Sequence, residues 1–241
     1  GYATGGFVSA YVLRKQVGIH QGFDHYDDEL PAVGPDTPLG QTQRGGMATL
    51  EAAQRWINST TSPRFFLFFH IYEPHRPYTP PAHIRNANNY DGEVEYADEI
   101  VGRLLSGLKS AGRYDDATIV LFSDHGEGLG DHGENEHGIF LYRETIRVPL
   151  IVKLPGATGG GRRVAVPVQH IDLVPTVLEL AGIDRSALGT ELRGRSLLPV
   201  LGGTGELEPA PIYSESLSPR FHFGWAELYA ISDDRYRLIR A

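Results

Sequence analysis

The densest group of chemically versatile side chains lies at residues 124–137 of the 241-residue sequence. These fourteen residues include five acids, three histidines and four glycines, and Leu129 is the only apolar residue among them. The group opens with Asp124 and His125, directly after the apolar run 119–122. A carboxylate and an imidazole at such a place can bind a metal ion or transfer protons. A solvated, charged surface loop has the same composition, so composition leaves both interpretations open.

A second candidate follows another apolar run. The run 65–69 leads into His70 and then into the segment Glu73-Pro74-His75-Arg76-Pro77. Prolines on both sides of His75 exclude regular structure and predict a rigid turn. An imidazole held there could hydrogen-bond to an anionic group or protonate a leaving oxygen. A lone histidine is more often structural, but six of the ten histidines fall between His70 and His137. Spacing and composition therefore predict a metal or acid–base site without naming a substrate.

The elements that must position these residues are strands that alternate with helices. The predicted strands are 1–10, 64–72, 117–123, 148–154 and 228–239. Apolar residues recur at helical spacing in 49–58, 90–111 and 172–181, and Gly112 is placed to end the second helix. The stretch 18–40, rich in glycine, proline and aspartate, is predicted as loop. This order predicts an α/β fold with a mainly parallel sheet, whose strand ends carry the candidate residues.

Composition limits the function further. The net charge of −8 and the pI of about 5.7 argue against a nucleic-acid partner, because nucleic-acid surfaces need clustered lysine and arginine. The chain has no cysteine, which excludes disulfides and thiolate metal sites within it. No apolar run approaches the length that spans a bilayer, so no membrane association is visible in this segment.

Taken in order along the chain, these motifs resemble the sulfatase family of the alkaline phosphatase superfamily. The matching segments are 21–24, 26–28, 65–78, 90–127, 130–133, 136–138, 147–150, 172–176 and 180–182. The resemblance covers nearly the whole chain. It implies an incomplete α/β domain with a mainly parallel sheet flanked by helices. Residues 1–200 would be a partial catalytic domain, and 201–241 the beginning of the C-terminal sulfatase region.

The resemblance also implies roles for single residues. Asp124 matches a metal-binding aspartate, and His125 stands where members have asparagine or histidine beside the metal and the ester oxygen. His75 matches the histidine that contacts the sulfate group. His137 stands twelve residues after His125, where many members carry a lysine that contacts the sulfate. The catalytic candidates are therefore His75, His125 and His137, and the metal candidates are Asp124 and His125.

The family's chemistry uses a formylglycine made from cysteine or serine, together with one divalent cation. Ca²⁺ is the cation implied, or Mn²⁺ or Mg²⁺ for a phosphoester or phosphonate hydrolase. No cysteine and no suitably placed serine occurs here, so the nucleophile is expected upstream of Gly1, and the fragment alone is expected to be inactive. The pair Asp27-Asp28 resembles a downstream loop rather than the family's early metal aspartates. His70 and His132 are expected to pack or to hydrogen-bond around the site.

The leading function is thus hydrolysis of a small anionic sulfate ester, either a sulfated carbohydrate or an aryl sulfate. Three alternatives stay open: a phosphonate or phosphodiester hydrolase, a membrane-bound phosphoethanolamine-type transferase with a threonine nucleophile, and a degenerate domain that only binds metal. Analogy with the family implies a periplasmic or secreted location.

Overall fold

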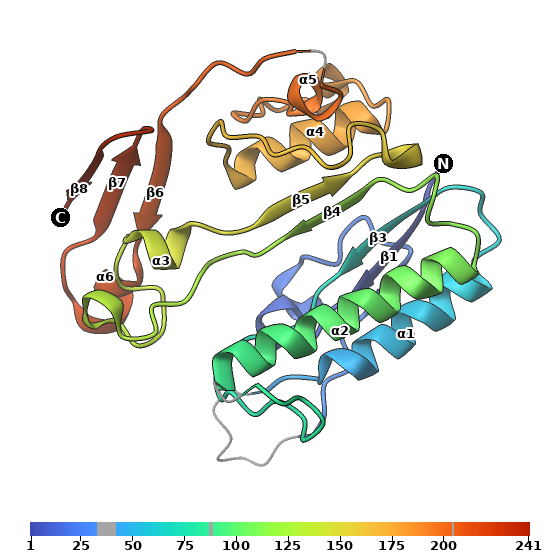
Figure 1. Cartoon of the computed structure of the whole chain (residues 1–241), viewed down its shortest axis with the longest axis horizontal. Coiled ribbons are helices and arrows are strands. Elements are labelled where there is room, and N and C mark those ends of the chain that lie inside the picture. Colours follow the sequence, from blue (N-terminus) through green and yellow to red (C-terminus); the bar gives the residue numbers. More distant parts are fainter. Residues whose placement is uncertain (33–41, 87–88, 204) are drawn as a thin grey trace. The chain divides into compact units, whose positions relative to one another are not determined.

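The computed structural model describes residues 1–32, 42–86, 89–203 and 205–241 (Figure 1). The chain divides into two compact units, Gly1–Asp115 and Asp116–Ala241, and each is described here by itself. The last part of the predicted loop 18–40, from residue 33 onward, lies outside the described residues. The division into a catalytic region 1–200 and a C-terminal region 201–241 stays a prediction.

The first unit is built on a parallel sheet of three strands. Strand β1 (Ala3–Phe7) lies between β2 (His25–Asp27) and β3 (Phe65–Phe69), and it pairs in parallel with both. Parallel strands flanked by helices confirm the predicted fold class. The prediction of a continuous loop over 18–40 was wrong in part, because strand β2 lies within that segment. Its central Tyr26 is buried and donates a hydrogen bond to the carbonyl of Leu13 at 2.6 Å.

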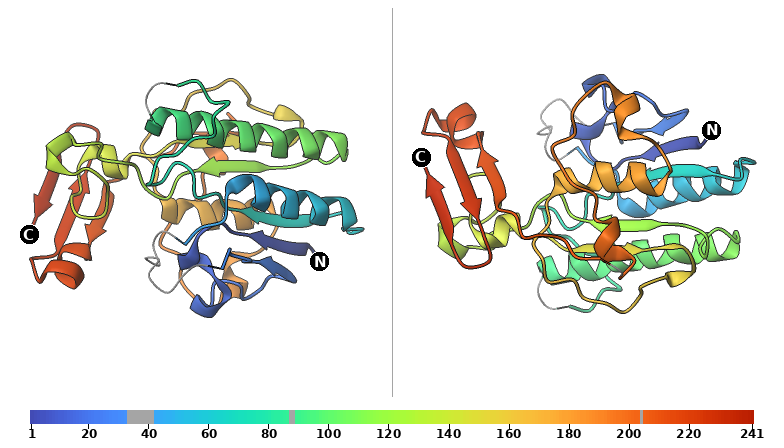
Figure 2. Two further views of the ribbon diagram at one scale, coloured as in Figure 1. Left: turned by 90° about the horizontal axis from the view of Figure 1, so that it is seen from below. Right: turned by 90° about the horizontal axis from the view of Figure 1, so that it is seen from above.

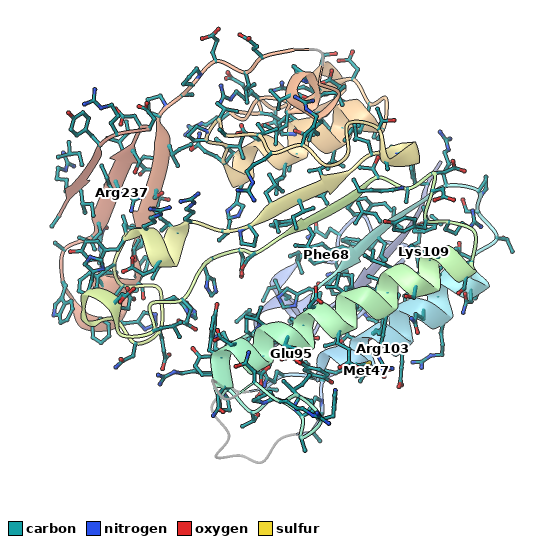
Figure 3. The ribbon with its side chains drawn as sticks, viewed as in Figure 1. Met47, Phe68, Glu95, Arg103, Lys109 and Arg237 are labelled. Atoms are coloured by element: carbon teal, nitrogen blue, oxygen red, sulfur yellow. The ribbon has the colours of Figure 1, made fainter. Side chains whose placement is uncertain are left out.

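Two long helices complete this unit. Helix α1 (Gly46–Ser59) packs on β1 and β3, and α2 (Asn89–Ser110) packs on α1 (Figure 1). Helix α2 ends as predicted: Gly112 takes a φ of +64°, and the next amide donates to the carbonyl of Leu108 at 2.8 Å. Helix α2 also carries the exposed polar side chains Glu95, Arg103 and Lys109 (Figure 3).

The core of the first unit lies between the sheet and α1. Phe7, Ala52 and Ala53 are buried there, and Trp56 packs against them. Strand β1 approaches its neighbours closely, because a Cβ on Gly5 would lie 2.9 Å from the Trp56 ring, and one on Gly6 would lie 2.5 Å from the Tyr26 ring. Aromatic rings therefore lie against the bare backbone of the central strand.

The second unit begins with two strands that carry the acidic, histidine-rich loop between them. Strand β4 (Ile119–Phe122) pairs with β5 (Leu150–Lys153), and the two are antiparallel. The sequence predicted both strands within a mainly parallel sheet, and this pair differs from that expectation in being antiparallel. Short helix α3 (Arg143–Ile146) precedes β5, and α4 (Leu173–Leu180) and α5 (Leu198–Leu201) follow it.

The chain finishes in an antiparallel sheet. Its strands are β6 (Ile212–Ser216), β7 (Leu228–Ser232) and β8 (Arg237–Arg240), which lie side by side in that order (Figure 2). Helix α6 (Ser218–Phe223) connects β6 to β7 along the chain. A single strand over 228–239 was the wrong prediction. Asp233 accepts hydrogen bonds from the amides of Arg235 and Tyr236, at 2.8 and 2.6 Å, and so turns the chain into a hairpin.

Short 3₁₀ turns join these elements at Tyr11–Leu13, Lys15–Val17, Asp131–Gly133, Pro155–Ala157, His170–Asp172 and Arg185–Leu188. Within the described residues, no helix has the length and apolar character that crossing a membrane requires.

Candidate functional site

Asp124 and His125 lie just beyond the end of β4, as predicted. Hydrogen bonds hold this strand end in place. The Ser123 hydroxyl donates to the carbonyl of His125 at 2.6 Å, and His170 Nε2 donates to the carbonyl of Ser123 at 2.9 Å. The amide of His125 donates to Asp124 Oδ1 at 3.1 Å. The side chain of Asp124 is 75% exposed, so its carboxylate is open to a ligand.

His125 and His137 lie together, although twelve residues separate them. Their rings stack with centroids 3.8 Å apart and planes 26° apart. Nδ1 of His125 lies 2.9 Å from the carbonyl oxygen of Gly126, so this nitrogen carries the hydrogen and Nε2 is left as the acceptor. Nε2 of His125 lies 3.7 Å from Asp124 Oδ2. Three of the four predicted site residues therefore form one group in the second unit.

Two acids of this loop are buried, which sequence reasoning missed. Glu127 is buried beside His137, and its Oε1 is 3.2 Å from Nδ1 of that ring. Glu134 accepts hydrogen bonds from the amides of Ile139 and Phe140, at 2.7 and 3.0 Å. Leu129, the only apolar residue of the loop, is exposed. The loop is thus held together by buried carboxylates. The glycines on either side of Glu127 are the sequence signal that could have indicated it.

His132 has the packing and hydrogen-bonding role that the sequence predicted for it. Its ring stacks on Tyr142 with centroids 3.9 Å apart, and its Nδ1 lies 2.6 Å from Glu144 Oε1. Burial by itself would raise the pKa of Glu144. Hydrogen bonds from its own amide and from His132 outweigh burial, so the pKa of Glu144 is lowered. His132 thus braces the end of the loop where α3 begins.

His75, the fourth predicted site residue, belongs to the first unit. Its ring stacks on Tyr72 with centroids 4.2 Å apart, and its Nε2 lies 3.2 Å from the Tyr72 hydroxyl. Nδ1 of His75 is 2.8 Å from the carbonyl oxygen of Arg76. As the prolines predicted, the segment around His75 has no helix or strand. Tyr72 therefore helps to orient His75, together with the carbonyl of Arg76, and the sequence pattern did not indicate this role.

Two carboxylates support the turn that carries His75. Glu73 Oε1 accepts the amide hydrogen of Gly46 at 2.8 Å, and Glu93 Oε1 accepts that of Thr79 at 2.8 Å. The Glu93 residue is only 4% exposed. Burial raises the pKa of Glu93, the hydrogen bond from Thr79 opposes that change, and the charge of Glu73 adds to it.

The described residues hold no group of three or more histidine, aspartate or glutamate side chains arranged to bind a metal ion. Asp124 and His125 are a pair of suitable donors with an exposed carboxylate, and they fit one side of a divalent-cation site. The pair Asp27-Asp28 is engaged elsewhere, which supports leaving it out of the site. Asp27 pairs with Arg44, and Asp28 accepts the amide of Lys15 at 2.7 Å.

Comparison with known proteins places the chain. A model of the sulfatase family matches residues 1–183, and a model described as N-sulphoglucosamine sulphohydrolase, C-terminal, matches residues 130–241. The chain is 36% identical over 118 residues to an N-acetylglucosamine-6-O-sulfatase of Bacteroides thetaiotaomicron. That alignment covers 49% of this chain and 20% of the relative. It is 31% identical over 156 residues to a choline-sulfatase of Rhizobium meliloti. That alignment covers 64% of this chain and 29% of the relative.

The chain thus spans 20% and 29% of the lengths of these two curated relatives. Its fold is similar to that of the phosphonate monoester hydrolase of Agrobacterium radiobacter, with a TM-score of 0.75 and 21% sequence identity. That match covers 100% of this chain and 69% of the hydrolase. Because the family model covers 183 of the 241 residues, the chain belongs to the sulfatase family.

Proposed function

We propose that this chain is part of a sulfuric ester hydrolase and supplies one side of its active site. The observation that carries the proposal is the stack of His125 on His137 beside the exposed carboxylate of Asp124. Imidazoles next to a carboxylate at a strand end are suited to holding an anionic ester and moving a proton. Membership of the sulfatase family supports this choice of reaction.

In this proposal, Asp124 and Nε2 of His125 bind a divalent cation. The bound cation would act as a Lewis acid on the ester oxygens. When both of its ring nitrogens carry hydrogen, His137 would donate one hydrogen bond to Glu127 through Nδ1 and one to the anionic group through Nε2. In the first unit, His75 is proposed to hydrogen-bond to a sulfate group, and Tyr72 orients its ring. Ca²⁺ is the proposed cation. Mn²⁺ is the first competitor to test, because the imidazole of His125 is a ligand that suits transition metals better than Ca²⁺.

The proposed nucleophile is a formylglycine encoded upstream of Gly1, because the chain contains no cysteine. The proposed substrate is a small sulfate ester, with sulfated carbohydrates first, since a relative is named as an N-acetylglucosamine-6-O-sulfatase. A location outside the cytoplasm is proposed on the same analogy. Phosphonate ester hydrolysis is the competing outcome that the substrate test must separate.

The test starts with the reading frame upstream of Gly1. A cysteine or serine in the family's nucleophile motif is expected there, and the complete protein is expected to release sulfate from N-acetylglucosamine-6-sulfate or 4-nitrophenyl sulfate. His125→Ala should abolish turnover. His222→Ala, at an exposed histidine of α6 that is not among the proposed site residues, should leave it unchanged. Release of 4-nitrophenol from 4-nitrophenyl phenylphosphonate, a phosphonate monoester, without sulfate release from the sulfate esters would favour the competing reaction. Absence of any nucleophile would refute the enzyme proposal.

A further inference from the structure

We propose that Glu127 is the positioning residue of His137. Its buried carboxylate accepts a hydrogen bond from Nδ1–H of His137 and holds the ring so that Nε2 is directed away from Glu127. The proposal deepens the proposed function, on which it rests for the role of His137 toward the ester. The pairing itself stands on geometry within the second unit and can be measured without turnover.

Burial shows that Glu127 faces the histidine rather than water. The side chain of Glu127 is 5% exposed and that of His137 is 22% exposed, with 3.2 Å between Oε1 and Nδ1. A carboxylate in such a place is costly unless hydrogen bonds compensate for its lost hydration. The imidazole N–H of His137 supplies one such bond, so the contact serves both residues.

The backbone on both sides of Glu127 is held in place. The amide of Gly126 donates to the carbonyl of Thr145 at 2.9 Å, and the amide of Gly128 donates to the carbonyl of Glu136 at 2.7 Å. The second bond joins the residue after Glu127 to the residue before His137. The two side chains are therefore brought together by the paths of two backbones.

Both glycines let the backbone around Glu127 pack closely against other segments of the second unit. A Cβ on Gly126 would lie 3.0 Å from the carbonyl carbon of Glu144 and closer still to its oxygen. A Cβ on Gly128 would lie 2.7 Å from the carbonyl oxygen of Glu136. A side chain at 126 would push the loop away from residue 144, and one at 128 would push it away from residue 136, next to His137. The Gly126-Glu127-Gly128 sequence is thus suited to holding one carboxylate against His137.

The two stacked rings are held in the same way. His125 directs Nδ1 to the carbonyl oxygen of Gly126, and His137 directs Nδ1 to the carboxylate of the next residue, Glu127. Adjacent acceptors on one short backbone segment therefore bind the Nδ1 atoms of both rings. In the proposed function Nε2 is consequently the ring nitrogen that serves the ligand, the cation for His125 and the ester for His137. The hydrogen bond at Nδ1 decides which tautomer each neutral ring adopts.

The tautomer of His137 in the unmodified chain is the first test. Nitrogen-15 NMR of the histidine rings, with His137→Ala to assign the signal, should show hydrogen on Nδ1 of the neutral ring. Hydrogen on Nε2 instead would refute the proposal without any variant of Glu127. The control is Asp131→Asn, which removes one negative charge from an exposed carboxylate of the same loop. It should leave the signal unchanged.

Two variants of Glu127 then separate its hydrogen bond from its bulk. Glu127→Gln keeps an oxygen that can accept the Nδ1 hydrogen, whereas Glu127→Leu keeps similar volume and removes the acceptor. Only Glu127→Leu should lose the Nδ1–H signal. In the complete enzyme, Glu127→Leu should lower kcat about 10- to 100-fold. Glu127→Gln should lower kcat less, and Asp131→Asn should leave kcat unchanged. An unchanged tautomer in Glu127→Leu overturns the proposal, and absence of turnover in every form, including the unmodified enzyme, refutes only the proposed function.

Discussion

Replacing Gly126 by alanine tests how closely the loop after β4 packs against the segment that enters α3. The new Cβ would lie 3.0 Å from the carbonyl carbon of Glu144 and 3.3 Å from the Cα of Thr145, with the carbonyl oxygen of Glu144 nearer still. Backbone atoms cannot rotate out of the way, so the two segments must separate. Overpacking of this kind costs about 1–3 kcal/mol. Loss of the hydrogen bond from the Gly126 amide to Thr145 adds about 1 kcal/mol.

The free energy of unfolding is therefore expected to fall by about 2–4 kcal/mol. Urea denaturation followed by circular dichroism measures the loss, and hydrogen exchange of peptides from 119–153 assigns it to the second unit. Gly102→Ala is the control, because nothing lies within 4 Å of a Cβ there and alanine is the better residue in the middle of α2. A Gly126→Ala chain within about 0.5 kcal/mol of the unmodified one would refute the packing argument.

Three further predictions concern buried polar groups. Since burial raises the pKa of Glu93, its contribution to stability is present below the pKa of the unfolded chain and is lost as pH rises through the higher folded value. Glu93→Gln should therefore gain stability relative to the unmodified chain as pH rises above 4.5, by about 1.4 kcal/mol for each unit by which the folded pKa exceeds the unfolded one. A pH-independent difference in urea denaturation would contradict this. Asp172 is 1% exposed and accepts hydrogen bonds from the amides of Gln169 and Arg195 at 3.0 and 2.9 Å. Asp172→Ala should therefore lower the free energy of unfolding by about 2–4 kcal/mol. The control Asp131→Ala should lower it hardly at all. Burial, together with the charge of Asp28, raises the pKa of Tyr26 to about 12. In an ultraviolet titration, Tyr26→Phe should therefore show a smaller absorbance change than the unmodified chain near pH 12 and the same change near pH 10.

Local sequence pattern was sufficient for the elements whose signals lie within one segment. Helix α2 was predicted within one residue of each end, because acids at its start, lysine near its end and Gly112 after it all agree. The hairpin of β7 and β8 was missed because the turn at Asp233 is set inside an otherwise strand-like stretch. The antiparallel pairing of β4 with β5 could not be predicted either, since strand direction depends on partners far away in the sequence.

The candidate site divides in the same way. Asp124, His125 and His137 were found because histidines and acids crowd a short loop after a buried strand. Glu127 was missed because a glutamate in a charged loop looks solvated. Its burial depends on the approach of residues 136 and 145, which no local pattern reveals. Tyr72 was missed for the opposite reason, since it looked like the end of an apolar strand.

The two glycines in the middle of β1 carry an implication for the history of this chain. Each leaves room for a ring from another element, Trp56 beside Gly5 and Tyr26 beside Gly6. A larger residue fits at position 5 or 6 only if the facing aromatic residue is replaced by a smaller one or is displaced. Residue sizes at positions 5 and 56, and at 6 and 26, should therefore vary inversely among related chains, so that alanine or serine in the strand accompanies a smaller residue opposite. An alignment of relatives that combine a bulky residue at position 5 with tryptophan at 56 would show that the sheet can widen instead.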